Sequence, residues 1–551
     1  MEQEILFEQE ILDETVKLDE VAELGFVFED SVEEARVILN NLIKRKIMLE
    51  GSFEDDDWIY LQTNGYQLTM RFSEFNSPFK VVLKCWCAEL CNRIYPQTAD
   101  SYLYIIRTAM DLTDNFLPGR TEMLREHIAE EWKLSESTKR HYVYALKSFL
   151  VYSSIEQSED YIACLNSIPL STESNVRQLP KFYDVLTFHD VINHFIKSWT
   201  EQEKLLYFPI VLWWKITSII PMRISEFCRL SRKGIVFTEK GALLTVIRSK
   251  NYAQQDETID TYEISLEISN LIKTYLDISN GYGSTETLIS YKMYKNLSME
   301  RNKYGRPDTQ INIEKFNTMN FNTLLDNFYC KIVEIKYGYK GIERIKPTDT
   351  RHFAFCSLML QGVDPLTIAR LGGHKKLESQ LHYQRHLDYF VESKIYQITR
   401  MNMLKLSNTE LFNSPFLLEE YEVRSLISLE KFKHIEETDE GGYCTDAKEL
   451  RCESTRSCFR CSKYWVSREV LTQKLAELES VDTDLFRSIN NRLKIIQRYY
   501  NEAYSLIDDG QFNIQANESL QYEVKGLKGD IHDSAMLKTL LLWEKGVQMN
   551  W

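Results

Sequence analysis

Apolar residues recur every three or four positions along most of the chain, a pattern typical of amphipathic and buried helices. The pattern predicts helices at residues 32–49, 81–95, 98–112, 121–132, 134–150, 184–199, 204–219, 224–230, 268–278, 321–337, 353–361, 471–507 and 535–545. Alternation of apolar and polar residues predicts two pairs of strands, at residues 58–62, 66–70, 243–247 and 258–264. Asn64 and Gly65 between the first two strands indicate a hairpin turn. We therefore expect a mainly α protein with small β-sheets, in the α+β class.

The length of 551 residues suffices for three or four domains with separate cores. Residues 166–180 contain two prolines and lack periodicity, which is typical of a linker. The expected parts are an acidic N-terminal accessory module, a helical domain, a larger mixed domain and a C-terminal extension, at residues 1–75, 76–172, 173–400 and 401–551.

The net charge of −15 is unusual for a protein that binds nucleic acid, but its distribution is uneven. Residues 1–60 hold 18 Asp and Glu against 5 Lys and Arg. Residues 171–400 are mildly basic, with 31 Lys and Arg against 25 Asp and Glu. The acidic segment is interpreted first as a solubilising surface, and alternatively as a surface that masks a basic groove or docks a partner.

The chain contains no run of 18 apolar residues, and its first residues are acidic, unlike a signal or transit peptide. We therefore expect a cytoplasmic protein with no membrane partner. Seven cysteines are scattered among apolar residues and are interpreted as reduced core thiols. They are Cys85, Cys87, Cys91, Cys164, Cys228, Cys330 and Cys356.

Candidate chemistry concentrates between residues 348 and 383. An arginine, Arg351, is followed 23 residues later by His374 and 9 residues after that by Tyr383. Helix–turn–helix geometry would bring this cation, imidazole and phenol together, a combination suited to chemistry on a phosphodiester.

Turn and cap residues divide this stretch into short helices. Gly362 ends the first helix, and Asp364 caps a second helix that begins with Pro365. Gly372 and Gly373 then end the second helix, so His374 is expected on a tight turn.

This stretch resembles the second half of the catalytic domain of tyrosine recombinases, the integrase-like site-specific DNA recombinases. That family has an H-x-x-R box, an L-G-H box and a Tyr nine residues beyond the His. The corresponding residues here are 348–351, Gly373 with His374, and Tyr383. The first box differs from the family pattern at one position: Thr348 stands where the family usually has His.

The resemblance extends upstream. The family has an arginine in an R-x-S-E box and a lysine on a β-hairpin, and this chain has Arg223 in PMRISE and Lys250 in VIRSKN. It further implies that residues 173–400 are the catalytic domain and that residues 76–172 are a helical core-binding domain that clamps DNA.

The resemblance implies a role for each residue. Tyr383 would attack the phosphodiester and form a 3′-phosphotyrosine, while Arg223 and Arg351 hold nonbridging oxygens. Lys250 would protonate the departing 5′ oxygen, and His374 would donate a hydrogen bond to the phosphate. No metal or ATP is required for this chemistry, because the covalent intermediate stores the bond energy.

Three of these assignments have competitors or limits. Tyr389 is the nearest competing tyrosine, and Lys240 competes with Lys250. Thr348 is a candidate DNA contact, because its hydroxyl can donate a hydrogen bond, but it cannot act as a base near neutral pH.

A helix start in the expected core-binding domain offers DNA contacts. Thr138, Lys139 and Arg140 follow a serine-rich cap and are candidates to face phosphates; the alternative is an ordinary solvated surface. The implied partners are double-stranded DNA and further copies of the chain, in a dimer or tetramer on two DNA sites. Other recombination proteins encoded by the same mobile element are a further candidate class.

The C-terminal extension contains two features of its own. Cys444, Cys452, Cys458 and Cys461 have spacings that suit a structural zinc site with four thiolates; the alternative is four reduced thiols in a loop. A cysteine-bearing extension is also similar to that of some transposon-encoded tyrosine recombinases that act as transposases. The long amphipathic helix at 471–507 would either pack back on its own domain or dock on a neighbouring subunit.

Together these features predict a DNA recombinase or transposase that integrates or excises a mobile element. Two alternatives stay open. A type IB topoisomerase-like enzyme would share the Arg, Lys and Tyr chemistry but relax DNA without strand exchange. A catalytically silent DNA-binding protein would fit the replacement at Thr348 and the acidic charge.

Overall fold

The fold is described from a computed structural model of the chain. It describes residues 17–61, 67–75, 79–131, 134–170, 178–248, 258–299, 315–374, 380–406, 424–433, 435–445, 457–507 and 514–545.

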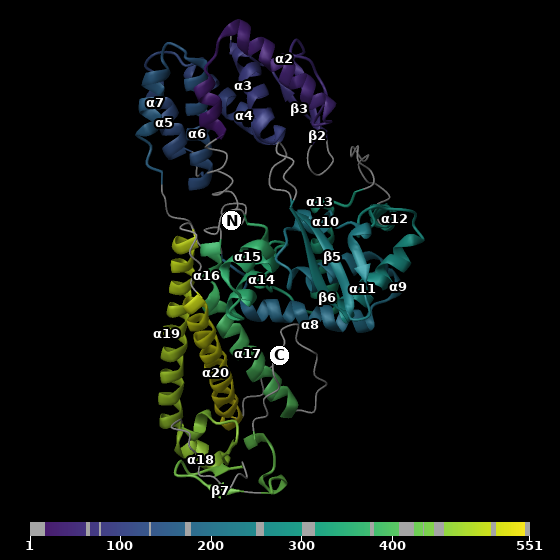
Figure 1. The fold of residues 1–551 in the computed structure, drawn as a ribbon, viewed down its shortest axis with the longest axis vertical. Coiled ribbons are helices and arrows are strands. Elements are labelled where there is room, and N and C mark those ends of the chain that lie inside the picture. The colour runs from purple at the N-terminus through teal and green to yellow at the C-terminus, as the bar shows by residue number, and fades with distance from the viewer. Residues whose placement is uncertain are drawn as a thin grey trace. The chain divides into compact units, whose positions relative to one another are not determined.

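Helices dominate the described residues, and the strands form three small sheets of three strands each (Figure 1). The predicted α+β class is confirmed. The chain divides into two compact units, one of residues 1–177 with 224–323 and one of residues 178–223 with 324–551. The four-part division by sequence stays a prediction.

The first segment of unit 1 is a helical bundle with a small antiparallel sheet of order β1-β2-β3. One hydrophobic core runs from Leu18 to Ile168, so the predicted accessory module and helical domain share a core. The predicted hairpin is present as β2 and β3, and its Asn64-Gly65 turn lies outside the described residues. The elements are α2 (Phe28–Lys44), β1 (Met48–Glu50), β2 (Asp57–Leu61), β3 (Gln67–Arg71), α3 (Phe79–Arg93), α4 (Pro96–Thr113), α5 (Thr121–Glu126), π-helical turn η1 (His127–Glu131), α6 (Glu136–Ser153) and α7 (Ser158–Asn166).

The second segment of unit 1 is built on an antiparallel sheet of order β4-β5-β6. On β5, Leu244 and Val246 are buried and Leu243 and Ile247 are exposed, which is the alternation of a half-buried strand. The elements are α10 (Ile224–Cys228), η2 (Arg232–Gly234), β4 (Ile235–Phe237), β5 (Gly241–Arg248), β6 (Thr258–Ser265), α11 (Leu266–Asn280), α12 (Tyr291–Met299) and α13 (Thr318–Phe328), which runs on into unit 2.

Unit 2 begins with a group of helices that share a buried core. Aromatic residues fill much of this core; Phe188, for example, packs on Trp214 and Tyr329. The elements are α8 (Phe182–Ser198), α9 (Glu201–Thr217), π-helical η3 (Tyr329–Lys336), α14 (Asp349–Leu360), α15 (Pro365–Gly372), α16 (Leu381–Gln384) and α17 (Leu387–Leu406).

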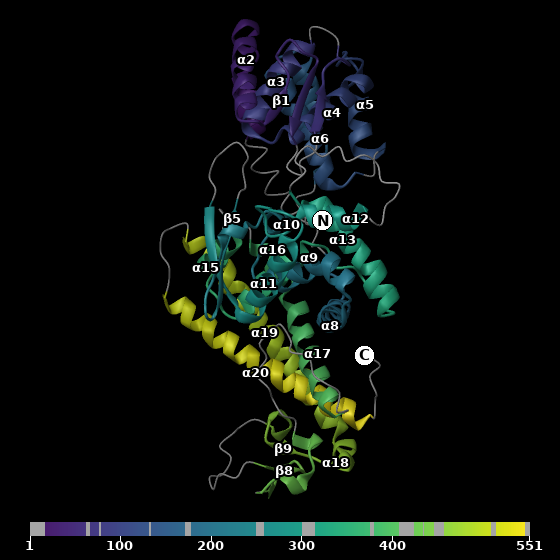
Figure 2. The same cartoon turned by 90° about the vertical axis from the view of Figure 1, so that its right-hand side faces the viewer.

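The C-terminal extension completes unit 2. Figures 1 and 2 show α19 and α20 running side by side, with α20 along α17. The helix predicted at 535–545 begins 21 residues earlier than expected, at Ile514. The elements are η5 (Arg424–Leu426), η6 (Leu429–Lys431), β7 (Glu436–Glu437), β8 (Tyr443–Cys444), η7 (Cys458–Arg460), β9 (Tyr464–Trp465), α18 (Arg468–Gln473), α19 (Leu475–Ile507) and α20 (Ile514–Glu544).

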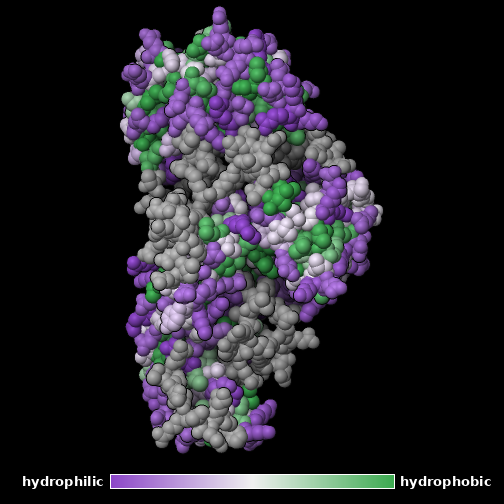
Figure 3. All heavy atoms as spheres, viewed as in Figure 1, coloured by the Kyte–Doolittle hydropathy of each residue, from purple (hydrophilic) through white to green (hydrophobic). Residues whose placement is uncertain are grey.

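The face of the molecule seen in Figure 3 is largely hydrophilic, with hydrophobic residues in small patches. Among the described residues, no helix is both long and apolar enough to cross a membrane. The seven scattered cysteines are free thiols; Cys164 and Cys330 are half-buried and the other five are buried. Burial raises the pKa of the Cys85 thiol to about 12, which fits the predicted unreactive core thiols.

Candidate active site

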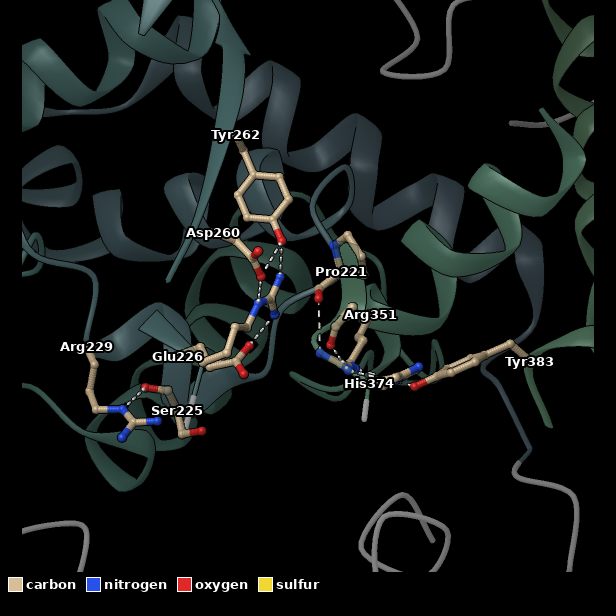
Figure 4. Close-up of polar contacts among 11 residues, drawn as sticks. Pro221, Ser225, Glu226, Arg229, Asp260, Tyr262, Arg351, His374 and Tyr383 are labelled. Carbon is tan, nitrogen blue, oxygen red and sulfur yellow. Dashed lines mark hydrogen bonds and ion pairs between the residues drawn. The ribbon is translucent and has the colours of Figure 1, made fainter. Parts of the chain in front are cut away.

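Arg351 is the centre of the candidate site. It lies in the first turn of α14, only 1% exposed, with its guanidinium over the ring of Phe355. Its Nη1 donates to the carbonyl of Pro221 at 3.0 Å, and its Nη2 donates to the carbonyl of Gly372 at 2.7 Å (Figure 4). Nη2 also lies 2.9 Å from Nε2 of His374. Because a guanidinium has only donors, that nitrogen accepts, and the neutral imidazole carries its proton on Nδ1.

The turn that holds His374 has the predicted cap residues. The Asp364 side chain accepts from the backbone N–H of Thr367 at 2.9 Å, and Pro365 begins α15. Gly373 ends the helix in the left-handed region, with φ of 63°. A Cβ on Gly372 would clash with the ring of Phe355, so this position must lack a side chain. The two glycines therefore let the turn close tightly and bring His374 onto Arg351.

Tyr383 completes the cluster. It lies on α16 and is 2% exposed, with its hydroxyl 3.4 Å from Nε of Arg351. Its ring stacks on Phe355, with ring centroids 4.1 Å apart, and packs against His352 at 4.6 Å. Phe355 also stacks on His374 at 4.9 Å, so one ring supports both proposed reacting side chains. The structure thus brings together the arginine, histidine and tyrosine that the spacing singled out.

The competing tyrosine is engaged elsewhere. The hydroxyl of Tyr389 donates to the carbonyl of Pro180 at 2.6 Å, and burial raises the pKa of this phenol above its usual value. Tyr383, with its hydroxyl near Arg351, is therefore the better placed of the two.

The remaining candidates are placed less fully. Arg223 is half-buried. It lies two residues after Pro221, the residue whose carbonyl accepts from Arg351. Thr348 is the half-buried residue before α14, and its carbonyl accepts from the N–H of Arg351 at 3.1 Å. Lys250 falls in residues 249–257, outside the described part of the chain, and Lys240 is exposed between β4 and β5.

Unit 1 contains a buried ionic network that sequence reasoning missed. Arg248 donates to Glu226 at 2.6 Å and to the hydroxyl of Tyr262 at 2.6 Å, and pairs with Asp260 at 3.5 Å (Figure 4). Arg248 and Glu226 are 4% and 2% exposed. Burial opposes the charge on Arg248, but the Glu226 carboxylate raises the pKa of the guanidinium above its ordinary value. The network ties α10, which follows Arg223, to the end of β5 two residues before Lys250.

Breaking this network should be costly. Arg248→Met should lower the free energy of unfolding by about 3–5 kcal/mol, because it leaves the Glu226 carboxylate buried without its cation. Urea titration measures the change, and Lys233→Met, at an exposed position, is the control. The double variant Arg248→Met with Glu226→Leu should recover most of the loss. A single-variant loss below about 1 kcal/mol, the value of a surface pair, would contradict this account.

The predicted DNA-contacting residues lie at the start of α6. Ser135 caps this helix by accepting from the N–H of Thr138 at 3.2 Å, and the two hydroxyls lie 2.8 Å apart. Lys139 pairs with Glu136 at 2.9 Å, and Arg140 is half-buried. Both Thr138 and Lys139 thus have partners within the chain, and their contact with DNA stays a prediction.

The cysteine cluster lies around the β7–β9 sheet. Cys444 on β8 pairs with Tyr464 of β9, and Cys458 and Cys461 bracket the η7 turn, where the N–H of Cys461 donates to the Cys458 carbonyl at 2.8 Å. Cys452 lies outside the described residues. Within the described ranges, no group of three or more Cys, His, Asp or Glu is placed to hold a metal ion.

Comparison with known proteins gives one family match. Residues 190–389 match the family model described as the phage integrase family, and this segment contains Arg223, Arg351, His374 and Tyr383. No curated protein matches the chain.

Solved structures of recombinases are similar at low identity. The XerH recombinase in a post-cleavage complex with its difH substrate is 15% identical, with a TM-score of 0.38, covering 57% of this chain and 82% of that chain. A lambda integrase dimer bound to a core site is 12% identical, with a TM-score of 0.35, covering 55% and 93%. The Tn1549 transposon integrase in complex with circular intermediate DNA is 14% identical, with a TM-score of 0.34, covering 52% and 87%. Similarities this distant do not bear on activity.

The family match and the site coincide, since Arg351, His374 and Tyr383 meet inside the matched segment. Residues 190–389 therefore match the phage integrase family, and the resemblance of this part of the chain to the tyrosine recombinases is confirmed.

Proposed function

We propose that the chain is a site-specific DNA recombinase or transposase that cuts and rejoins DNA through a 3′-phosphotyrosine and so integrates or excises a mobile element. The observation that carries this proposal is the convergence of Arg351, His374 and Tyr383 in one buried cluster within the family domain. A phenol beside a guanidinium is suited to attack on a phosphodiester, because the cation favours the phenolate and binds the phosphate.

The proposed reaction is a pair of transesterifications. The Tyr383 oxygen bonds to phosphorus and loses its proton to solvent, while the bond from phosphorus to the 5′ oxygen breaks. Lys250 donates a proton to the departing 5′ oxygen, a contribution typically worth ~10²–10⁴ in rate. A 5′ hydroxyl from a second DNA strand then attacks the phosphotyrosine and passes its proton to the neutral Lys250 amine. The bond from phosphorus to the Tyr383 oxygen breaks, the phenolate regains a proton from solvent, and the backbone is resealed. Because the bond energy is kept in the phosphotyrosine, this chemistry needs no ATP and no metal.

The arginines stabilise the charge that builds up on the phosphate. Arg223 can present a fork of donors that matches two nonbridging oxygens. Arg351 uses both Nη groups on the Pro221 and Gly372 carbonyls and on His374, so it acts on the phosphate mainly through its fixed positive charge. Arg351 is held from two sides by backbone carbonyls and is buried, so its donors are fixed before substrate binds. Thr348 can give the phosphate at most one hydrogen bond and no proton transfer. Lys250 therefore supplies the proton, and His374 supplies a further hydrogen bond to the phosphate.

DNA recognition and assembly follow from the same proposal. Thr138, Lys139 and Arg140 would contact phosphates, which for Lys139 requires exchanging its ion pair with Glu136 for one with DNA. Rejoining strands from two sites needs at least two copies of the chain, so we expect a dimer or tetramer on paired sites.

Strand exchange separates this proposal from its alternatives. A pool of nicked random-sequence duplexes should yield a covalent adduct, and the trapped strands give the preferred site. Two differently labelled duplexes with that site should then exchange strands in the presence of EDTA and without ATP. Relaxation of supercoiled plasmid without exchange would indicate a topoisomerase-like enzyme. Binding with no adduct would indicate a silent DNA-binding protein.

We also propose a structural zinc ion held by Cys444, Cys452, Cys458 and Cys461. Support comes from the tight Cys458–Cys461 turn beside β9, the strand that pairs with Cys444 on β8; such a turn resembles the knuckle that presents two thiolates to one metal. Four thiolates leave no open position, so the role would be structural.

Metal content tests the zinc site. The purified full chain should contain about one zinc per molecule, measured by mass spectrometry of the metal, because four thiolates bind zinc tightly. Cys458→Ser with Cys461→Ser should remove the metal, whereas Cys164→Ser with Cys330→Ser, away from the cluster, should keep it. Absence of zinc from protein purified without chelators would refute the site.

A further inference from the structure

The C-terminal arm, defined as α19 and α20, packs on the helices of its own catalytic domain. Helix α19 contacts α15, α16 and α17, and α20 contacts α17. The contacted helices carry or flank the candidate site, since Tyr383 is on α16 and His374 follows α15. Of the two arrangements expected from the amphipathic pattern, packing within the chain is the one present in this structure.

The arm binds backbone carbonyls at the ends of the two helices that carry the reacting groups. Near the end of α14, the hydroxyl of Tyr500 lies 2.8 Å from the carbonyl of Val363 and 3.2 Å from that of Met359. At the end of α16, Nε2 of Gln497 donates to the carbonyl of Gln384 at 3.1 Å. A third arm residue, Gln521 on α20, donates to the carbonyl of Gly362 at 2.6 Å. The last carbonyls of a helix lack partners within it, so Gln497 supplies a donor that the four-residue α16 cannot.

The bond at Gln384 bears directly on Tyr383, the preceding residue. Helix α16 spans four residues, Leu381–Gln384, which is too short to be stable on its own. Its position therefore depends on tertiary contacts. Gln497 fixes its C-terminal end, while Phe355 and His352 pack on the Tyr383 ring.

The arm itself is rigidly held. Arg492 on α19 pairs with Glu523 at 2.7 Å and Asp530 at 2.9 Å on α20. Helix α20 is bound to α17 through Thr399, which donates to the Ala535 carbonyl at 3.2 Å. Tyr500 is fully buried, so its hydroxyl has these carbonyls in place of water. These contacts make the arm a fixed support for the candidate site.

We propose that the C-terminal arm is a brace, acting within its own chain, that positions Tyr383 against Arg351, with Gln497 and Tyr500 as the positioning residues. The arm contacts lie near the C-terminal ends of α14 and α16, and they keep the Tyr383 phenol next to the Arg351 guanidinium. Displacement of the arm would loosen α16 and stop cleavage, so the brace is also a point at which activity can be controlled. Its catalytic consequence rests on the proposed function, but its structural consequence does not.

Amide hydrogen exchange on the free full-length chain tests the structural part. Tyr500→Phe and Gln497→Glu each remove a donor to a buried carbonyl with little change in shape. Each should speed exchange in peptides from the α14 and α16 ends, at residues 359–363 and 380–387, by about 5- to 30-fold. Tyr499→Phe, at the half-buried neighbouring position, is the matched control and should leave exchange unchanged. Unchanged exchange in both variants would overturn the brace.

Adduct kinetics test the positioning role. At saturating nicked duplex, Tyr500→Phe and Gln497→Glu should slow adduct formation about tenfold while DNA affinity stays the same, because the arm residues act on Tyr383. Gln497→Lys, which keeps a donor, should retain most of the rate. A loss of DNA affinity with a normal rate at saturation would overturn the positioning role. The wild-type chain could form no adduct while amide hydrogen exchange in the variants still speeds up as expected. In that case the proposed function is wrong and the structural role of the brace is supported.

Mixed assemblies decide whether the arm acts within one chain. Chains with Tyr500→Phe keep Tyr383, and chains with Tyr383→Phe keep an intact arm. If the arm acts within its own chain, mixing them leaves adduct formation slow. Recovery of the wild-type rate would show that the arm is donated to a neighbouring subunit, and would overturn the proposal.

Discussion

Replacing Tyr383 with Phe abolishes the covalent protein–DNA adduct and leaves DNA affinity within about twofold of wild type. The change removes one oxygen and keeps the ring that stacks on Phe355 at 4.1 Å, so the cluster should stay packed. No other hydroxyl near Arg351 is positioned to replace the nucleophile among the described tyrosines, since Tyr389 is bonded to Pro180. Adducts are measured by denaturing gel after reaction with a nicked duplex.

Tyr389→Phe is the matched control for this variant. It should form adducts at close to the wild-type rate, because its hydroxyl serves only the Pro180 carbonyl. Adducts that persist in Tyr383→Phe and vanish in Tyr389→Phe would reverse the assignment.

Replacing Arg351 with Lys slows cleavage at saturating DNA by about 10²–10³, the usual cost of losing a preorganised donor at a developing charge. Lysine keeps the positive charge but has one nitrogen, so it cannot bind the carbonyls of Pro221 and Gly372 while also facing a phosphate. The rate constant of adduct formation, measured in single turnover, is the readout.

Arg370→Lys, at an exposed position on neighbouring α15, is the control and should cleave normally. Thermal unfolding of Arg351→Lys should confirm that the chain is folded. A purely binding defect, with a normal rate once DNA is saturating, would contradict the transition-state role of Arg351.

The convergence of Arg351, His374 and Tyr383 was predictable because its signals are local. The turn that carries His374 is set by the Asp364 cap, by Pro365 and by the two glycines. Each of these signals acts on the backbone over a few residues, so it predicts the same local structure in any fold. The hairpin of β2 and β3 was predictable for the same reason.

The first half of α20 could not be predicted from sequence because two glycines interrupt it. Gly526 and Gly529 lower helix propensity, which hid the first 21 residues of the helix. In the structure Arg492 lies where a Cβ on Gly526 would be, held there by its pairs with Glu523 and Asp530. Packing against α19 thus overrides local preference.

Two other features depend on distant partners. Helix α17 buries Ser393, Gln397, Thr399 and Asn402, so a search for an apolar stripe does not recognise its inner face. From sequence, Arg248 resembles a surface cation two residues before Lys250. Its burial could not be predicted, because it depends on the ion pair with Glu226. The polar partners lie far along the sequence: Asn402, for example, donates to the Thr539 hydroxyl, 137 residues away.

Mapping the attached residue tests the central claim most directly. The adduct from a nicked duplex is digested with protease and nuclease, and the modified peptide is sequenced by mass spectrometry. The account predicts one modified residue, Tyr383, joined to the 3′ phosphate of the cleaved strand. Attachment at any other residue, or through a 5′ phosphate, would contradict it.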